Sequence, residues 1–118
     1  NNSQIRILRI YISSTDKSGN QLLFETLVFK AKSMGLSGAT VFKGILGYGA
    51  SSVIHSYKFW EVTDKVPVVV EIIDDEQKIM SFYDSVKPIL ETMRYGCLAI
   101  IEKADLLLYK PGATKHII

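Results

Sequence analysis

The chain has 118 residues, of which 47% are hydrophobic and 22% charged, and its formal net charge is +2. This length predicts a single domain over residues 1–118, with residues 1–3 and 113–118 as loose ends. The scattered basic residues argue against a nucleic-acid partner, the single cysteine excludes an internal disulfide and a multi-cysteine zinc site, and no apolar run reaches the ~20 residues of a membrane span. We therefore expect a cytoplasmic protein without membrane insertion.

The chain begins with a pattern typical of a strand followed by a helix. Residues 4–12 alternate between polar and apolar side chains, which predicts a strand with one buried face. After a loop rich in turn residues, apolar residues recur at three- and four-residue spacing over 21–34, which predicts an amphipathic helix. We expect Ser18 or Asn20 to cap this helix and Gly35 to end it.

A second strand is predicted over residues 40–45, and it runs into a glycine-rich stretch. Gly44, Gly47 and Gly49 lie within six positions. Glycines spaced in this way shape a hairpin turn or allow the backbone to approach a ligand, and the sequence leaves both readings open. The stretch is not a dinucleotide-binding fingerprint, because no helix is predicted after the glycines.

Residues 55–73 predict one long strand with an irregularity near residues 63–66. Its second half, PVVVEII, is rich in β-branched residues and is the expected centre of the sheet. Pro67 has no N–H to donate to a sheet ladder, so we expect a bulge or an edge position there.

A second helix and a last strand complete the pattern. Asp74 and Asp75 are expected to cap the helix, because carboxylates favour the positive end of the helix dipole. Pro88 predicts a kink or a new first turn, and Tyr95 with Gly96 predicts the end of the helix. The final strand is expected within residues 98–109, starting at Leu98.

The order βαββαβ predicts an α+β fold of the ferredoxin-like split βαβ type, with a four-stranded antiparallel sheet and two helices on one face. The helices leave the other face of such a sheet uncovered. The predicted strands contain too many large apolar residues for one buried face, and a bare apolar face indicates an interface. We therefore expect a homo-oligomer that packs its sheets together. The residues behind this expectation are Phe42, Phe59, Trp60, Val68 to Val70 and Leu106 to Leu108.

Three segments together resemble a known family: IYISSTDKSGNQLLFETLVFKAKSMGL, then GATVFKGILGYGASSVIH, then PVVVEIIDDEQKI. They are similar to an uncharacterised bacterial and archaeal family related to the PII signal-transduction proteins, and the resemblance covers about Ile7 to Tyr109. It implies a PII-like homotrimer with nucleotide pockets in the clefts between subunits. It also implies a loop over residues 46–53, after the second strand, that regulates a partner protein such as a transporter or an enzyme.

The resemblance also implies which residues contact the nucleotide. In PII proteins the threonine of the second strand lies against the adenine, glycines at the base of the loop lie close to the base and phosphates, and an apolar residue of the third strand contacts the adenine. A glycine before the last strand and late basic residues complete the site. The matching positions here are Thr40, Gly47 and Gly49 with Tyr48 between them, Ile72, Gly96 and Lys110. Arg94 is a further candidate, because a guanidinium can pair with a phosphate bidentately.

The chain departs from the PII pattern on the phosphate side. The phosphate-binding lysine of the PII loop is missing from the run Arg94, Tyr95, Gly96 and Cys97, and of two late basic positions one holds Leu108 while only Lys110 is basic. No cofactor is required by the sequence. Bound ADP, AMP, a cyclic nucleotide or a different small ligand is expected in preference to ATP held with full PII geometry.

Alternative readings of single residues remain open. Thr40 can be an ordinary strand residue, Tyr48 an exposed loop residue, and Arg94 a cation that favours the C-terminus of the second helix. His55 is expected to be structural and Cys97 to be a small buried apolar residue.

The sequence predicts no catalytic residues and no metal site, since it shows no nucleophile arrangement and its two histidines are far apart. We therefore do not expect an enzyme. Two alternatives to a nucleotide-binding regulator remain. One is a trimeric structural or interaction module without a nucleotide, and the other is a metal-responsive trimer of the same fold.

Overall fold

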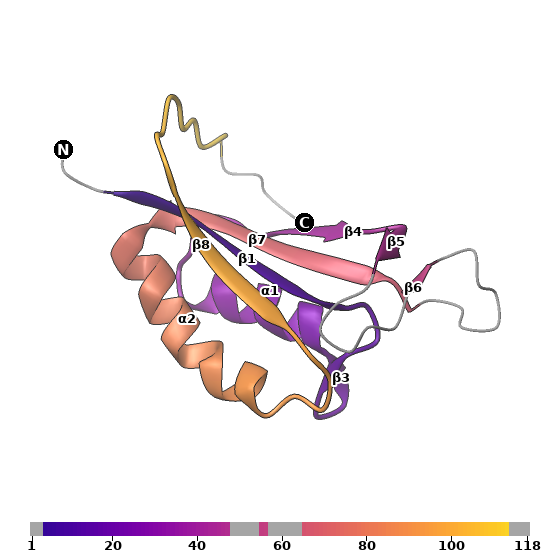
Figure 1. Ribbon diagram of the computed structural model, residues 1–118. Helices are drawn as coiled ribbons and strands as arrows, with labels where there is room; N and C mark the ends of the chain where they lie inside the picture. Colours follow the sequence, from indigo (N-terminus) through magenta and orange to yellow (C-terminus); the bar gives the residue numbers. More distant parts are fainter. Residues whose placement is uncertain (1–3, 48–54, 57–64, 114–118) are drawn as a thin grey trace.

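The computed structural model describes residues 4–47, 55–56 and 65–113. Within these residues, one antiparallel sheet has the strand order β4-β7-β1-β8. Both helices lie on the same side of this sheet (Figure 1). The strands are β1 (Ile5–Ser13), β4 (Thr40–Lys43), β7 (Pro67–Asp75) and β8 (Leu98–Ala104), and the helices are α1 (Leu23–Ser33) and α2 (Glu76–Glu91).

Two short hairpins lie outside the main sheet. In the first, β2 (Lys17–Ser18) pairs with β3 (Gln21–Leu22), and in the second, β5 (Leu46–Gly47) pairs with β6 (His55–Ser56). Apart from these additions, the order of strands and helices is the predicted βαββαβ, and every pairing in the main sheet is antiparallel. The predicted ferredoxin-like architecture is therefore confirmed.

The central pair of strands, β1 and β7, sets the two faces of the sheet. They are paired over nine positions, from Ile5 opposite Asp75 to Ser13 opposite Pro67. Because successive side chains of a strand point to opposite faces, alternate residues of both strands reach the helices. On this helix-covered face the buried apolar residues are Leu8, Ile10, Ile12, Val68, Val70 and Ile72.

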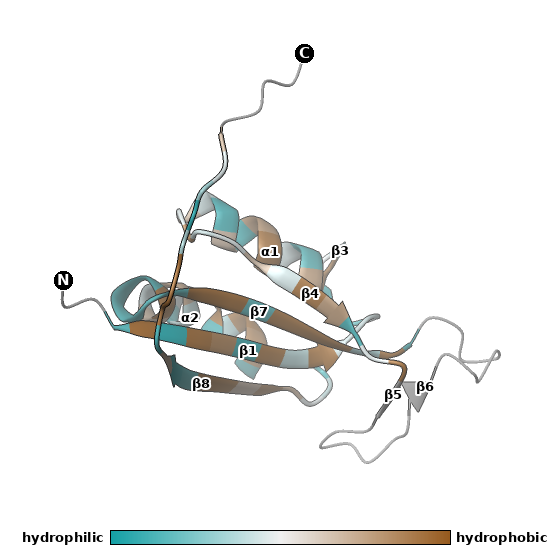
Figure 2. Cartoon of the chain, turned by 90° about the horizontal axis from the view of Figure 1, so that it is seen from above, coloured by the Kyte–Doolittle hydropathy of each residue, from teal (hydrophilic) through white to brown (hydrophobic). Residues whose placement is uncertain are grey.

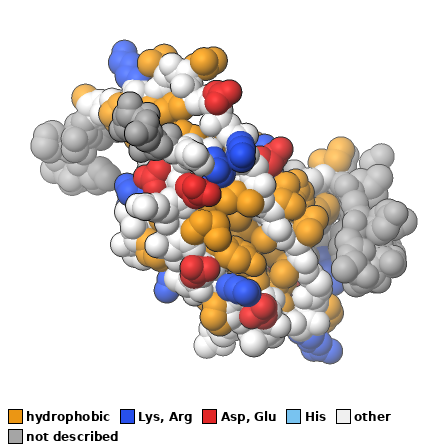
Figure 3. All heavy atoms as spheres, turned by 60° about the vertical axis from the view of Figure 1, so that its left-hand side comes forward, with side chains coloured by type: hydrophobic (Ala, Val, Ile, Leu, Met, Phe, Trp, Pro, Cys, Tyr) orange, Lys and Arg blue, Asp and Glu red, His pale blue; other side chains and the backbone are white. Residues whose placement is uncertain are grey.

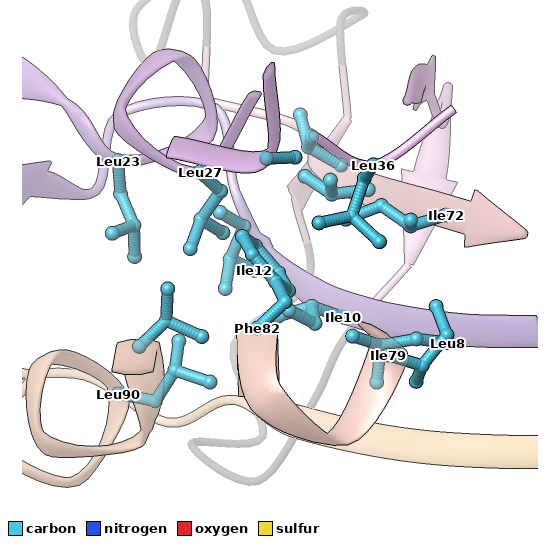
Figure 4. Packing of buried hydrophobic residues seen from close by; sticks show 14 residues of the cluster. Leu8, Ile10, Ile12, Leu23, Leu27, Leu36, Ile72, Ile79, Phe82 and Leu90 are labelled. Atoms are coloured by element: carbon cyan, nitrogen blue, oxygen red, sulfur yellow. The ribbon is translucent and has the colours of Figure 1, made fainter. Parts of the chain in front are cut away.

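The helices close the core over that face. Their apolar side chains point toward the sheet and meet those of the strands (Figure 4). Phe82 and Ile79 of α2 and Leu23 and Leu27 of α1 have no exposed surface, so the two helices and the sheet share one core.

The start of α1 differs from the prediction, and neither Ser18 nor Asn20 caps it. The N-cap is Leu22, which has no side-chain capping hydrogen bond. The Leu23 N–H, the first of the helix, instead donates to the backbone carbonyl of Asp16 at 2.7 Å. The end of α1 is as expected, since Gly35 follows it with a φ of +82°, in the left-handed region that favours glycine.

The prediction of one long strand over residues 55–73 is also wrong. His55 and Ser56 pair with β5, and β7 starts only at Pro67. Pro67 is the first residue of an interior strand and therefore lies neither at a bulge nor on an edge strand. Proline is tolerated there, because its missing N–H falls at the end of the ladder.

The second helix begins as predicted and ends early. The Asp75 carboxylate accepts a hydrogen bond from the Lys78 N–H at 3.0 Å, which confirms it as the N-cap. The helix is continuous through Pro88 and stops at Glu91, before Tyr95 and Gly96. Strand β8 ends at Ala104, so the sheet does not include residues 105–109, while Phe59 and Trp60 lie outside the described residues.

Replacing Phe82 with alanine should destabilise the fold by about 3–5 kcal/mol, because it opens a cavity in a fully buried site between the helices and the sheet. The matched control is Phe29→Ala on α1, where the ring is 58% exposed and the expected loss is about 1 kcal/mol or less. Urea unfolding followed by circular dichroism measures both. Equal losses for the two variants would contradict the described core.

Candidate functional site

One groove lies where the connection after α1, the end of β7 and the segment after β8 meet. Its volume is about 700 Å³. Residues 105–113 leave the end of β8 and rise from the sheet (Figure 1). Three of them, Leu106, Leu108 and Tyr109, line one side of the groove. The lining residues are Ile5, Ser37, Gly38, Ala39, Thr40, Glu71, Ile73, Asp74, Lys78, Leu106, Leu108 and Tyr109.

Asp74 connects two segments that line this groove through hydrogen bonds. One of its carboxylate oxygens accepts from the Ser37 N–H at 2.8 Å, and the other accepts from the Asp75 N–H at 2.7 Å. The Ser37 hydroxyl donates to the Ile73 carbonyl at 3.1 Å. These contacts fix residues 37–39 against the end of β7, directly before the strand that begins at Thr40.

Among the predicted ligand residues that the structure describes, Thr40 is the one that lines this groove. It is exposed at the first position of β4, and it lies opposite Glu71 of β7. Opposite residues of an antiparallel pair share a face, so Thr40 and Glu71 both belong to the face that the helices leave open. The Thr40 hydroxyl is therefore placed to act as a donor or an acceptor toward a bound molecule.

Ile72 does not lie in the groove. Its side chain is 1% exposed and belongs to the core, on the helix-covered face. This placement does not fit the predicted contact between Ile72 and a ligand, because strand alternation brings the neighbouring Ile73 to the groove instead.

The glycine positions are described only in part. Gly47 belongs to β5 and pairs with His55 of β6, so it lies in a hairpin. Tyr48 and Gly49 lie outside the described residues. Their predicted contacts with a ligand stay predictions.

Arg94 lies at the other end of β1 from the groove. It lines a separate pocket of about 230 Å³ with Thr15, Asp16 and Lys17, which follow the end of that strand. Its guanidinium carbon lies 5.4 Å from the centre of the Tyr95 ring, and the Lys65 ammonium lies 4.8 Å from the same ring. Within one chain, Thr40 and Arg94 therefore belong to different pockets.

The two remaining predicted residues are exposed. Gly96 follows the Tyr95 pocket and precedes β8, and Lys110 follows Tyr109, which lines the groove. The described residues form no ion pair with Lys110.

The groove also contains residues that the sequence did not predict as ligand contacts. They are Ser37, Lys78, Leu106, Leu108 and Tyr109. The Lys78 ammonium lies 3.5 Å from the Gly35 carbonyl, beside the groove wall. The sequence did contain a signal for this part of the groove. The run Asp74, Asp75 and Glu76 lies where β7 ends and α2 begins, close to the strand that was expected at the site. The reading assigned this run to helix capping, and Asp75 does cap the helix.

Cys97 is half-buried, and its thiol contacts the Leu90 carbonyl at 3.8 Å. Burial raises the pKa of the Cys97 thiol, and the negative charge of Asp16 raises it further. The thiol is therefore protonated at neutral pH, in which form it is a poor nucleophile and a poor metal ligand. The described part of the chain contains no cluster of three metal-ligating side chains.

Replacing Asp74 with alanine should cost about 1–3 kcal/mol of stability, because two backbone N–H groups lose their acceptor. Asp84→Ala, an exposed position on α2, is the control and should change stability by no more than about 0.5 kcal/mol. Thermal unfolding measures both variants. If Asp74→Ala melts with the parent chain, the Asp74 contacts do not hold residues 37–39.

Comparisons with solved structures place the fold among PII-like proteins. CPII, a nitrogen regulatory PII-like protein from Thiomonas intermedia K12 bound to ADP, AMP and bicarbonate, superposes with a TM-score of 0.61 at 13% identity over 86% of this chain and 88% of that one. A PII-like signalling protein from Thermus thermophilus superposes with a TM-score of 0.58 at 17% identity, with the same coverage. At these identities the likeness concerns the fold.

Comparisons of sequence give nearer relatives. A UPF0166 protein of Aquifex aeolicus is 40% identical over 82 residues, which cover 70% of this chain and 78% of the relative. A UPF0166 protein of Methanocaldococcus jannaschii is 36% identical over 74 residues, covering 63% and 68%. No helix among the described residues is long and apolar enough to cross a membrane.

The sequence profile of DUF190, described as an uncharacterised family, matches residues 5–106. The resemblance stated from the sequence is thereby confirmed, and the chain belongs to the DUF190 family.

Proposed function

We propose that this protein is a PII-like regulator that binds an adenine nucleotide in the groove beside Thr40. The observation that carries the proposal is the groove itself, in which Thr40 faces an apolar wall and several polar groups. Its volume of about 700 Å³ lies within the range of about 300–1,000 Å³ that is usual for small-molecule sites.

The lining supports a nucleoside better than a long phosphate chain. Ile73, Leu106 and Leu108 offer apolar surface to the flat faces of a base. Thr40 and the carboxylates offer hydrogen-bond partners to an amino group or to ribose hydroxyls.

Only one lysine, Lys78, lies among the groove residues, together with the carboxylates Glu71 and Asp74. Two negative charges disfavour a triphosphate, so we expect AMP or ADP to bind more tightly than ATP. CPII, which shares the fold, is a PII-like protein whose structure holds ADP and AMP.

We further propose that the working form is a homotrimer, as the family resemblance implies. Thr40 and Arg94 lie in pockets at opposite ends of β1 in one chain. A cleft between two copies offers a way to bring these two ends together. A subunit cleft of this kind would add Arg94 and Lys110 to the phosphate side of the site.

The regulatory part of the proposal concerns the connection between β5 and β6. We infer that residues 46–53 change conformation with the nucleotide and contact a partner protein, such as a transporter or an enzyme, in the cytoplasm. The chain then acts as a sensor and not as an enzyme.

Isothermal titration calorimetry with ATP, ADP, AMP and cyclic AMP tests the proposal. Thr40→Val keeps the shape of the side chain and removes its hydroxyl, so it should weaken AMP binding about fivefold to tenfold, equivalent to about 1–1.4 kcal/mol. The control is Thr92→Val, since the Thr92 hydroxyl donates to the Pro88 carbonyl of its own helix at 2.8 Å.

Absence of heat with all four nucleotides would contradict nucleotide binding. That result would favour the alternative of a trimeric structural or interaction module without a nucleotide. Equal affinities for the Thr40 and Thr92 variants would place the nucleotide elsewhere.

A further inference from the structure

The face of the sheet that the helices leave open is largely apolar and carries three charges. By strand alternation and register, its apolar residues are contributed by all four strands, and the view onto the strands shows hydrophobic positions along each of them (Figure 2). The largest of them are Ile5, Ile7, Tyr11, Phe42, Ile73 and Leu98, and Tyr11, Phe42, Ile73 and Leu98 are between 37% and 57% exposed.

Part of the exposed hydrophobic surface is continuous. On the side that Figure 3 shows, hydrophobic side chains form one continuous area with acidic and basic side chains around and within it. A continuous apolar area of this kind is typical of a surface that another molecule covers.

Arg9 and two glutamates form an ion cluster on the open face. The Arg9 Nε donates to Glu71 at 2.9 Å, and one terminal nitrogen of Arg9 pairs with Glu102. Arg9 belongs to β1, while Glu71 and Glu102 come from the strands on its two sides, β7 and β8. One positive and two negative charges leave the ion cluster with a net charge of −1.

The ion cluster can form further hydrogen bonds. A guanidinium has five N–H donors, and the described residues accept from two of those of Arg9, so three remain for other acceptors. The Glu102 side chain is 52% exposed, against 27% for Arg9 and 20% for Glu71. Glu102 lies on the edge strand β8, so its carboxylate is the member of the cluster that is best placed to reach beyond its own chain.

The molecule that covers this face must match both its apolar area and its charges. A wholly apolar partner would bury the remaining Arg9 donors without acceptors, which is costly. A second copy of this chain offers the same apolar area, carboxylate oxygens for Arg9 and N–H donors for Glu102. The same face thus carries both a donor, Arg9, and an exposed acceptor, Glu102. A contact from Glu102 of one copy to Arg9 of the next is head-to-tail, and it gives a closed ring such as a trimer where the rotation between copies closes.

We propose that Glu102 of one copy hydrogen-bonds Arg9 of the next and thereby fixes how the open faces of two copies align. The apolar residues supply most of the attraction, whereas the ion pair between copies selects one relative orientation. This inference rests on the homotrimer of the proposed function and assigns it a specific polar contact.

The test compares two substitutions at neighbouring positions of β8. Glu102→Gln removes the charge on the open face and keeps the size of the side chain. Lys103→Gln removes a charge on the opposite face of the same strand, where it lies opposite Arg6. Both positions are exposed, so both variants should fold, and far-UV circular dichroism checks this.

Sedimentation velocity over a dilution series measures the concentration at which each oligomer dissociates. The parent chain and Lys103→Gln should dissociate at the same concentration. Glu102→Gln should dissociate at a concentration at least about tenfold higher, because it has lost one charged hydrogen bond between copies. Raising the salt concentration from about 0.05 to about 0.5 M should weaken the parent oligomer more than the Glu102→Gln oligomer, because salt screens the ion pair between copies that this variant lacks.

If Glu102→Gln associates as tightly as the parent chain, the ion pair between copies is refuted while the trimer stands. If the parent chain is monomeric throughout, both the inference and the trimer fail. Nucleotide binding is judged separately by the calorimetry with Thr40→Val, so the two proposals fail independently.

Discussion

The pairing of β1 with β7 over nine positions is the constraint on which the rest of the molecule depends. Because side chains alternate along both strands, this one register sends Leu8 and Ile72 toward the helices and Arg9 and Glu71 toward the open face. The core and the ion cluster are thus two faces of the same pairing. Glu71 also lines the groove beside Thr40, so the register joins the proposed ligand site to the proposed contact between copies.

Local patterns predicted the architecture, and distant contacts explain where the sequence reading was wrong. The alternation over residues 4–12, the helical spacing of apolar residues and Gly35 after the first helix are features of neighbouring residues. The start of α1 depends instead on the carbonyl of Asp16, seven residues before the N–H that it accepts. His55 likewise pairs with Gly47 and not with a strand of the main sheet. The residues around His55 carry no pattern that distinguishes this short strand from the start of a longer one.

The sequence motifs predicted which strands contribute to the site, but not every residue that faces it. Thr40 reaches the groove because it opens β4, whereas Ile72 points into the core because it differs by one position from Ile73. A resemblance identifies the strand, and only the strand's register tells which residue faces the ligand. Lys78 and Tyr109 join Thr40 through contacts between distant parts of the chain, and sequence spacing does not report these.

The position of β1 between β7 and β8 has a consequence for synthesis of the chain. β1 pairs with residues 67–75 on one side and with residues 98–104 on the other. During synthesis β1 is therefore made well before either of its partner strands, and its pairing with β8 can form only after its pairing with β7 has become possible. Pairings so distant in sequence also slow folding, because long loops must close first. The order of the strands along the chain thus keeps β1 unpaired until β7 has been made.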